Sequence, residues 1–228
     1  AFADMSGEER GLLNLIDVKL PQSLTALLQW TFVGTGFTEI TIPKNVTYIN
    51  APFIYTQGLT VRFETGSKIE TIDSLGTQSD TVTAVTIPAS VKEIKAGAFQ
   101  KSSLNEITFE EGSQLKTIGE NAFASCNLKT ITLPAKLESI GAKAFDSCKL
   151  KTINYKGKAE DWSCIDLDID WYEGIPATIV SCMDYDIPIY LAGLPEYIGT
   201  KSPSDTKEVG DIIFSDGSAM SYDYFLEN

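Results

Sequence analysis

The chain has 228 residues, of which 43% are apolar, and it carries a formal net charge of −13 at pH 7. It contains no histidine, which removes the commonest general base and the commonest metal ligand of proteins. Acidic residues outnumber basic residues by 31 to 18, which argues against nucleic acid as a partner, and no apolar run reaches the roughly 18 residues needed for membrane insertion.

The first segment predicts a short capping helix. Ser6 and Glu9 form a capping-box pattern, and apolar residues follow at helical spacing as far as Ile16. A repeat protein needs such a cap because its first coil otherwise exposes apolar surface and an unpaired strand edge. Since the chain begins at Ala1 rather than Met, we expect that a signal segment was removed or that the chain was cut from a longer one.

From residue 18 onward the sequence repeats about every 22 residues. Six units begin in turn at Val18, Ile40, Val61, Val85, Ile107 and Ile131, and a seventh start at Ile153 soon loses the pattern. Self-similarity at a fixed period is typical of solenoids, in which each coil stacks only on its neighbours. Such proteins usually offer a binding surface rather than a catalytic pocket.

Within each unit the apolar positions predict two short strands and a turn. In the fourth unit, Val85 and Ile87 alternate with Thr86, and Pro88 ends the strand because it has no N–H to donate. The same positions recur in the next units, so like side chains are expected to stack, as in the row Phe99, Phe123 and Phe145. We therefore expect a right-handed solenoid of short parallel strands.

The repeated unit also resembles a known family. It follows the pattern I-x-I-P-x-x-V-x-x-I-x-x-x-A-F-x-x-C-x-L-x-x-I, as in ITLPAKLESIGAKAFDSCKLKTI at 131–153, and this pattern resembles the BspA-like leucine-rich repeat. The resemblance covers residues 18–182 and implies a leucine-rich-repeat solenoid with a strand-rich C-terminal cap. Members of this family are commonly bacterial secreted or surface proteins, so the resemblance implies an extracellular or cell-surface location.

The distribution of charge divides the chain into a neutral part and an acidic part. Residues 1–159 hold 16 basic and 16 acidic side chains, whereas residues 160–228 hold 2 and 15. The predicted organisation is a capping segment over 1–17, a solenoid over 18–154, a cap over 155–200 and a last segment over 201–228. This last segment is either an acidic tail or the start of a truncated second domain.

The outward-facing strand residues are the candidate ligand-binding site, which we expect on the concave face. They form a row of threonines with one Arg and one Asn: Thr41, Arg62, Thr86, Thr108, Thr132 and Asn154. Two interpretations remain open. Neighbouring threonines stabilise a strand ladder by roughly 0.2–1 kcal/mol a pair, which is a purely structural role. Alternatively, the row is a hydroxyl-lined platform on which Arg62 determines specificity.

The four cysteines divide into two pairs. Cys126 and Cys148 occupy the same position in successive units, and we expect them to be free buried thiols. Cys164 and Cys182 flank the predicted cap, and whether they form a disulfide is left open. The sequence has no CxxC motif and no histidine, so a structural zinc site is not expected.

Three alternating aspartates, Asp166, Asp168 and Asp170, are the other candidate for metal binding. The EF-hand template fails because Trp171 and Ala177 stand where that loop needs Gly and Glu. Alternate residues of a strand point to the same side, and this explains the spacing of the three aspartates equally well. We therefore expect no metal, no cofactor and no catalytic residue.

These patterns favour a non-enzymatic secreted or cell-surface leucine-rich repeat protein. Its partner would be an extracellular protein or glycan, bound in adhesion or in host or matrix interaction. The alternative is a spacer or targeting repeat module attached to a C-terminal functional domain that this chain only begins.

Overall fold

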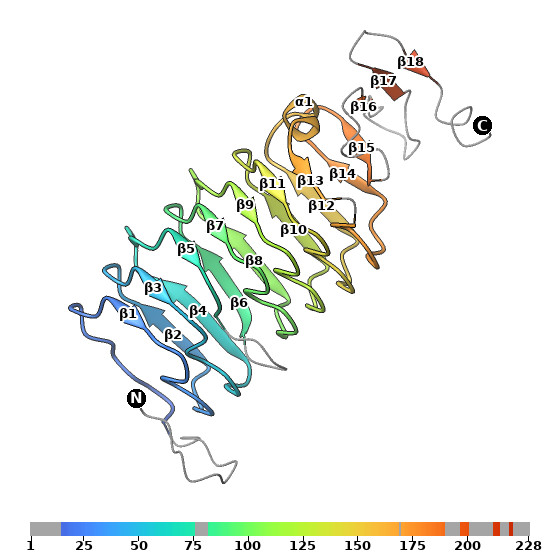
Figure 1. Ribbon diagram of the computed structural model, residues 1–228. Helices are drawn as coiled ribbons and strands as arrows, with labels where there is room; N and C mark the ends of the chain where they lie inside the picture. The colour runs from blue at the N-terminus through green and yellow to red at the C-terminus, as the bar shows by residue number, and fades with distance from the viewer. Residues whose placement is uncertain are drawn as a thin grey trace.

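The computed structural model of the chain describes residues 15–75, 82–168 and 170–189, together with the backbone of three later strands. These residues form a parallel β-solenoid, as the sequence predicts (Figure 1). The capping helix predicted within residues 1–17 lies outside the described residues, apart from 15–17, which are not helical.

One side of the solenoid is built from the longer strand of each coil. We call it the long-strand sheet; its members are β2 (Glu39–Ile42), β4 (Leu59–Phe63), β6 (Val82–Ile87), β8 (Glu106–Phe109), β10 (Thr130–Leu133), β12 (Thr152–Tyr155) and β14 (Ile179–Ser181). The strands β2 to β8 pair in parallel, as do β10, β12 and β14, and β8 lies next to β10 in the stack (Figure 1).

The other side is built from two-residue strands. We call it the short-strand sheet; its members are β1 (Ala26–Leu27), β3 (Tyr48–Ile49), β5 (Thr71–Ile72), β7 (Glu93–Ile94), β9 (Thr117–Ile118), β11 (Ser139–Ile140) and β13 (Asp166–Leu167). The strands β5 to β13 pair in parallel, and a parallel bridge between Asn50 and Ser74 joins the β1–β3 pair to them. Each coil therefore places one long and one short strand on opposite sides of a shared core.

The core is a set of ladders of like side chains. Phe99, Phe123 and Phe145 are fully buried, with ring centroids 5.3 and 5.4 Å apart and interplanar angles of 7° and 4°. This separation is close to the ~4.8 Å spacing of paired strands, so each ring lies over the ring of the previous coil. Trp171 continues the row, with its ring edge-on to Phe145 at 6.1 Å. The predicted stacking of like on like is confirmed.

The turn that carries each phenylalanine needs a left-handed backbone residue two positions later. This residue has φ between 57° and 62° in five coils, where it is Gly34, Tyr55, Lys101, Ser125 or Ser147. A Cβ in this conformation meets the following carbonyl oxygen, which costs about 1–2 kcal/mol. Only Gly34 avoids that cost, so the other four turns are held in place by the stacking around them.

Replacing Lys101 by glycine is therefore expected to stabilise the protein. Among the residues that the structure describes, the exposed Lys101 side chain makes no ion pair, and its N–H donates to Ala124 O at 2.8 Å whatever the side chain. We expect a gain of up to about 1 kcal/mol in the free energy of unfolding, because relief of strain exceeds the extra flexibility of glycine in the unfolded chain. Denaturant titration measures this change in the free energy of unfolding. Lys101→Val should lower stability, and a gain with valine would contradict the explanation.

Parallel stacking continues one coil beyond residue 154, where the sequence places the end of the solenoid. The strand β12 pairs in parallel with β14, and β11 pairs in parallel with β13. A short helix, α1 (Ala159–Ser163), lies between β12 and β13. The segment predicted as a strand-rich cap thus begins as a further coil that contains a helix.

Pairing becomes antiparallel after β14. The strand β15 (Asp186–Pro188) folds back on β14, and the backbone of three later strands extends this sheet: β16 (Tyr197–Thr200), β17 (Ile212–Phe214) and β18 (Ala219–Met220). The Asp184 carboxylate accepts the Ala159 N–H at 2.8 Å, which ties the loop before β15 to α1. Parallel growth of the stack therefore ends at β14. Most of the predicted last segment, 201–228, lies outside the described residues.

Candidate functional site

The structure brings the predicted site residues together in one row on the long-strand sheet. Thr41 pairs in register with Arg62, Thr86 with Thr108, and Thr132 with Asn154. Their chain neighbours Ile40, Ile42, Val61, Val85, Ile87, Ile107, Ile131, Leu133 and Ile153 are buried, so the six side chains face outward. We call these six residues the threonine row.

Hydrogen bonds within the threonine row satisfy part of its polar capacity. The hydroxyls of Thr86 and Thr108 lie 2.9 Å apart, and Asn154 Nδ2 donates to Thr132 Oγ1 at 3.4 Å. A threonine hydroxyl can make three hydrogen bonds and a guanidinium can make five, so capacity toward solvent remains. The row therefore both stabilises the ladder and presents donors and acceptors outward.

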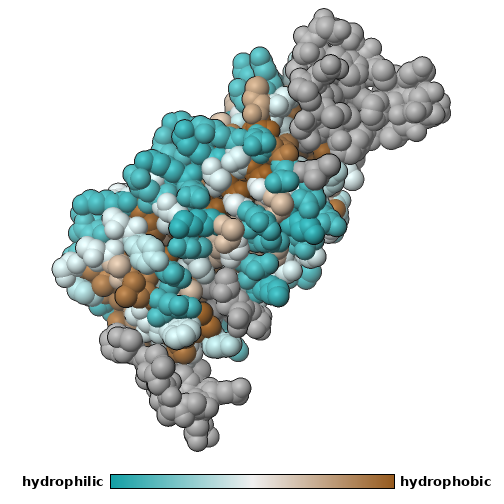
Figure 2. All heavy atoms as spheres, in the orientation of Figure 1, coloured by the Kyte–Doolittle hydropathy of each residue, from teal (hydrophilic) through white to brown (hydrophobic). Residues whose placement is uncertain are grey.

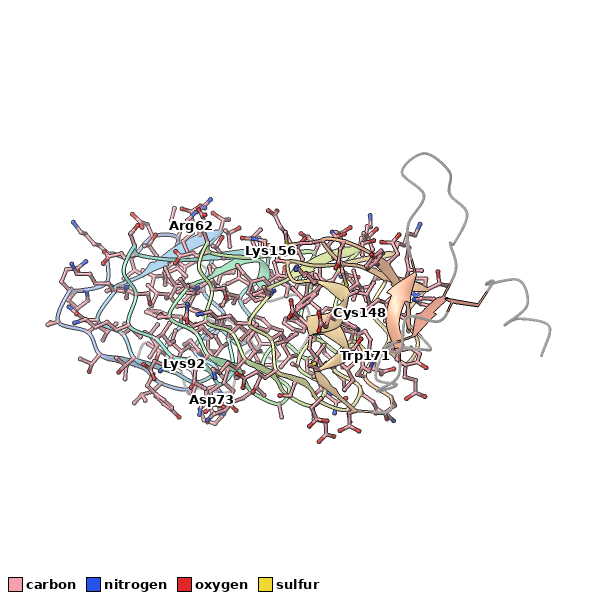
Figure 3. The ribbon with its side chains drawn as sticks, turned by 90° about the horizontal axis from the view of Figure 1, so that it is seen from above. Arg62, Asp73, Lys92, Cys148, Lys156 and Trp171 are labelled. Carbon is pink, nitrogen blue, oxygen red and sulfur yellow. The ribbon has the colours of Figure 1, made fainter. Side chains whose placement is uncertain are left out.

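Arg62 is the one cation of the row. Its Nε lies 3.1 Å from Glu39 Oε2, and the two side chains are 57% and 52% exposed. Figure 3 shows Arg62 projecting from one side of the solenoid, opposite Lys92 and Asp73. An exposed ion pair of this kind leaves most guanidinium N–H groups accessible to a ligand.

The outward face of the short-strand sheet is different, because it carries ion pairs between successive coils. Lys92 lies 2.9 Å from Glu70, and Lys95 lies 3.2 Å from Asp73. The hydrogen bond to Asp73 and the charge of that carboxylate raise the pKa of Lys95. Sequence reasoning missed these pairs, although opposite charges at one repeat spacing are visible in the sequence.

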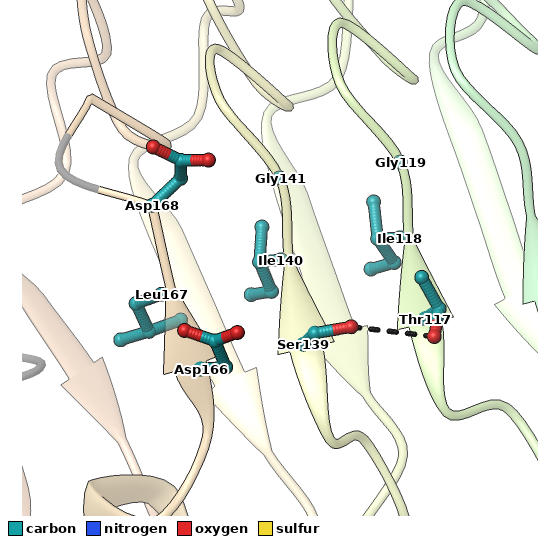
Figure 4. A pocket seen from close by; sticks show the side chains of 9 residues that line it. All are labelled: Thr117, Ile118, Gly119, Ser139, Ile140, Gly141, Asp166, Leu167 and Asp168. Atoms are coloured by element: carbon teal, nitrogen blue, oxygen red, sulfur yellow. Dashed lines mark hydrogen bonds between the residues drawn. The ribbon is translucent and has the colours of Figure 1, made fainter.

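A shallow groove of about 370 Å³ lies on this same face, and sequence reasoning did not find it. It is lined by three consecutive residues from each of three neighbouring coils: 117–119, 139–141 and 166–168 (Figure 4). Ser139 Oγ donates to Thr117 Oγ1 at 3.2 Å on one side. The signal that could have found the groove is the pair Gly119 and Gly141, which follow the inward Ile of two successive short strands.

Apolar side chains are exposed over the N-terminal coils. Leu28, Trp30 and Tyr48 are 59%, 48% and 42% exposed. Figure 2 shows a hydrophobic area there on a face that is otherwise mostly hydrophilic. Asn50 Nδ2 donates to the Tyr48 hydroxyl at 3.1 Å, so the hydroxyl of this exposed ring has a hydrogen-bond partner.

The inner cysteines are structural. Cys126 and Cys148 are buried free thiols, as expected, and each Sγ donates to the carbonyl oxygen of a phenylalanine in the previous coil, to Phe99 at 3.1 Å and Phe123 at 3.0 Å. The contact with Cys126 and burial raise the pKa of Cys148. These thiols therefore act as small donors that satisfy buried carbonyl groups.

Cys164 and Cys182 are also free thiols, so the disulfide considered for them is not formed in the structure. Cys164 is exposed and Cys182 is partly buried. Burial, with the nearby charge of Asp184, raises the pKa of Cys182 to about 12, which keeps this thiol protonated and weakly nucleophilic.

The three aspartates considered for calcium lie near the groove. Within the described residues, no group of three or more His, Cys, Asp or Glu side chains is arranged to hold a metal ion. Asp170 Oδ2 instead lies 4.0 Å from Lys143 Nζ, which also lies 3.4 Å from Glu173. No helix among the described residues is long and apolar enough to cross a membrane.

The fold and its ladders define a leucine-rich-repeat solenoid. The family model described as a BspA type leucine rich repeat region (6 copies) matches residues 10–114 and 70–163. These matches span more than half of the chain, and the chain therefore belongs to the BspA-type leucine-rich repeat family. A comparison with curated proteins finds no match.

Two solved structures have a similar fold. The pneumococcal vaccine antigen PcpA is 23% identical over 73% of this chain, with a TM-score of 0.51. A leucine-rich repeat protein from Bacteroides ovatus is 22% identical over 70% of this chain, with a TM-score of 0.52. The matched regions are 40% and 41% of those two chains, so this chain spans about two fifths of their length.

Proposed function

We propose that the chain is a non-enzymatic, extracellular or cell-surface repeat protein that binds a protein or glycan ligand through the threonine row. One observation carries the proposal: six outward-facing polar side chains lie on six successive strands of the long-strand sheet, in register within three strand pairs, with Arg62 among them. Membership of the BspA-type family and the fold shared with a vaccine antigen support the surface location.

The chemistry of the row suits a polar, extended ligand. Hydroxyl groups both donate and accept hydrogen bonds, so they can pair with sugar hydroxyls or with peptide groups. The Arg62 guanidinium can bind a carboxylate with two parallel hydrogen bonds, since its pair with Glu39 engages only Nε. The absence of histidine from the chain supports a role in binding rather than in acid–base catalysis.

The test is a binding screen with the full chain at physiological salt, against immobilised fibronectin, fibrinogen and collagens and a glycan panel. Replacing Arg62 by alanine should lower the affinity for the ligand about tenfold. The free energy of unfolding should fall by less than about 1 kcal/mol, because the ion pair with Glu39 is exposed. A large loss of stability would instead make Arg62 a structural residue.

Lys92→Ala is the matched control. It breaks an ion pair of similar exposure, with side chains 53% and 64% exposed, on the opposite sheet. Ligand binding should be unchanged in this variant. Equal weakening in both variants would show that the threonine row is not the site, and no binding by the parent would favour the spacer or targeting role.

A further inference from the structure

Basic side chains gather in the last two regular coils of the solenoid. Residues 127–158 hold seven lysines and only two acidic residues, although the whole chain has a net charge of −13. Four of these lysines lie around the strands β10 and β12 and are exposed. We call them the lysine cluster: Lys129, Lys149, Lys151 and Lys156. The C-terminal end of the threonine row is therefore flanked by positive charge.

The lysine cluster has no carboxylate partner in the described part of the chain. None of its ammonium groups forms an ion pair there, and Lys149 Nζ donates to the neutral Asn127 Oδ1 at 3.0 Å. The two acidic residues of this stretch are engaged elsewhere. Glu138 lies 2.6 Å from Lys116 beside the short-strand sheet, and Asp146 accepts a hydrogen bond from the hydroxyl of the next residue at 3.2 Å.

Two lysines of the cluster lie side by side. Lys151 N donates to Lys129 O at 2.9 Å, so the two residues are neighbours in successive coils, about 4.8 Å apart. Like charges at neighbouring positions of a sheet destabilise it. In the preceding coil the equivalent position, directly after the inward leucine, holds the neutral Asn105. The repulsion therefore arises in the last two regular coils, and a bound anion would remove it.

The lysine cluster encloses polar side chains of the long-strand sheet. Lys151 precedes β12 and Lys156 follows it, so their backbones lie about 16 Å apart at roughly 3.3 Å per residue. The outward side chains between them are those of Thr152 and Asn154. Figure 3 shows Lys156 on the same side of the solenoid as Arg62. The result is a strip of hydroxyl and amide groups with a cation at each end.

The charges around the cluster limit the length of the anion that it can bind. On one side, residues 160–189 hold eight acidic and no basic side chains, and on the other side β8 begins with Glu106 and is followed by Glu110. The positive area between them covers two coils and is about 10 Å wide. A long polyanion such as nucleic acid would extend over these carboxylates, whereas a short anionic segment would not.

The groups between the lysines favour a sugar over a peptide. Hydroxyl and amide groups both donate and accept hydrogen bonds, as sugar hydroxyls do, so the two sets can pair. A peptide that binds by its main chain needs an unpaired strand edge. The strand β12 offers no such edge, because it pairs with β10 on one side and β14 on the other. A ligand therefore meets only the side chains on the face of the sheet.

We infer that the lysine cluster binds the anionic groups, sulfate or carboxylate, of an acidic glycan. One anion lies between Lys129 and Lys151, a second lies at Lys156, and the sugar hydroxyls between them pair with Thr152 and Asn154. This inference rests on the proposed function, because it names the class of ligand for the C-terminal end of the threonine row.

The test measures fluorescence anisotropy of a labelled heparin hexasaccharide, added to the full chain at about 50 mM salt, where screening is weak. We expect saturable binding whose affinity falls at least tenfold in Lys129→Gln/Lys151→Gln. Lys129→Arg/Lys151→Arg keeps both charges and should bind as the parent does. The glutamine variant should unfold at the midpoint of the parent or above it, because the repulsion is removed. Parent affinity in this folded variant would overturn the inference.

Lys44→Gln/Lys68→Gln is the matched control. These two lysines are also exposed neighbours in successive coils, since Lys68 N donates to Lys44 O at 2.9 Å. They have a carboxylate beside them, however, because Glu64 accepts the Lys44 N–H at 3.1 Å. The control removes the same charge in the N-terminal coils and should keep the parent affinity. Equal weakening in both variants would show that binding follows net charge alone, which overturns the inference.

Other probes identify the anion and the class of ligand. A hyaluronan hexasaccharide carries carboxylates without sulfates. If it binds as heparin does, carboxylate is the group recognised; if it binds more weakly, sulfate is, and both results support the inference. Equal binding of neutral maltohexaose would overturn the inference, as would tighter binding of a hexaglutamate peptide than of either acidic sugar. A parent chain that binds neither acidic sugar would overturn it as well.

This inference and the proposed function fail in different ways. If only the inference is wrong, a ligand from the binding screen depends on Arg62 and neither acidic sugar binds. If only the assignment of Arg62 is wrong, the acidic sugars bind and depend on Lys129 and Lys151, while no ligand loses affinity in Arg62→Ala.

Discussion

Replacing Phe123 by alanine is expected to lower the free energy of unfolding by about 3–5 kcal/mol. The side chain is fully buried, and its ring lies between those of Phe99 and Phe145 at 5.3 and 5.4 Å. Alanine leaves a cavity with rigid aromatic walls on both sides, so the neighbouring coils cannot collapse into it. Chemical denaturation monitored by circular dichroism measures the loss.

Two controls define what the Phe123 result means. Phe123→Leu keeps most of the volume and should cost less than about 1.5 kcal/mol. Tyr55→Ala removes an aromatic ring that is 59% exposed, so its effect should be small. If Phe123→Ala unfolded with the midpoint of the parent, the aromatic ladder would contribute little to the stack.

Gly119→Ala is expected to cost several kcal/mol, although it adds only one methyl group. The new Cβ would lie 2.5 Å from Ala96 N and 2.7 Å from the carbonyl carbon of Lys95. Overpacking usually costs about 1–3 kcal/mol, and here the clash is with backbone, so the upper end or more is expected. Relief requires β7 and β9 to separate, which breaks their ladder. The unfolding midpoint in denaturant reports the loss.

Gly112→Ala separates this steric effect from a backbone effect. Gly112 has φ of +74° and nothing within 4 Å of an added Cβ, so alanine should cost only the roughly 1–2 kcal/mol of a left-handed residue. Gly119→Ala should therefore destabilise the protein more than Gly112→Ala does. The reverse order would show that the coils can separate at this point at little cost.

The sequence predicted the regular part of the fold because each coil stacks only on its neighbours, so one repeat period along the chain determines the contacts. A period near 22 residues places each side chain over its equivalent in the next coil, which is enough to predict the stack of Phe99, Phe123 and Phe145. Alternation within a strand is likewise enough to predict which side chains of the threonine row face outward. Whether these side chains bind a ligand depends on a partner and stays a prediction.

The end of the solenoid was harder to predict because the coil after β12 departs from the repeat. The strand β12 begins at Thr152 and β14 at Ile179, so this coil is longer than the usual repeat and includes α1. Trp171 takes the place of the phenylalanine in the aromatic row. Stacking therefore continues after the sequence pattern has been lost.

The groove depends on distances that no sequence pattern contains. Gly119 and Gly141 are explained only by the approach of two backbones in space, and the repeat gives Lys95 at the equivalent position one coil earlier. The left-handed residue at Lys101 is similar, since nothing in its side chain favours that conformation. In both cases the contacts of the stack override local preference.

Blocking the exposed side of the long-strand sheet tests most directly whether this side binds the ligand, as we propose. Thr108→Arg places a bulky cation within the threonine row, whereas Thr71→Arg places the same side chain on the short-strand sheet. For a ligand found in the screen, affinity should fall at least tenfold in Thr108→Arg and stay at the parent value in Thr71→Arg. Unchanged affinity in Thr108→Arg would show that this side of the sheet does not bind the ligand.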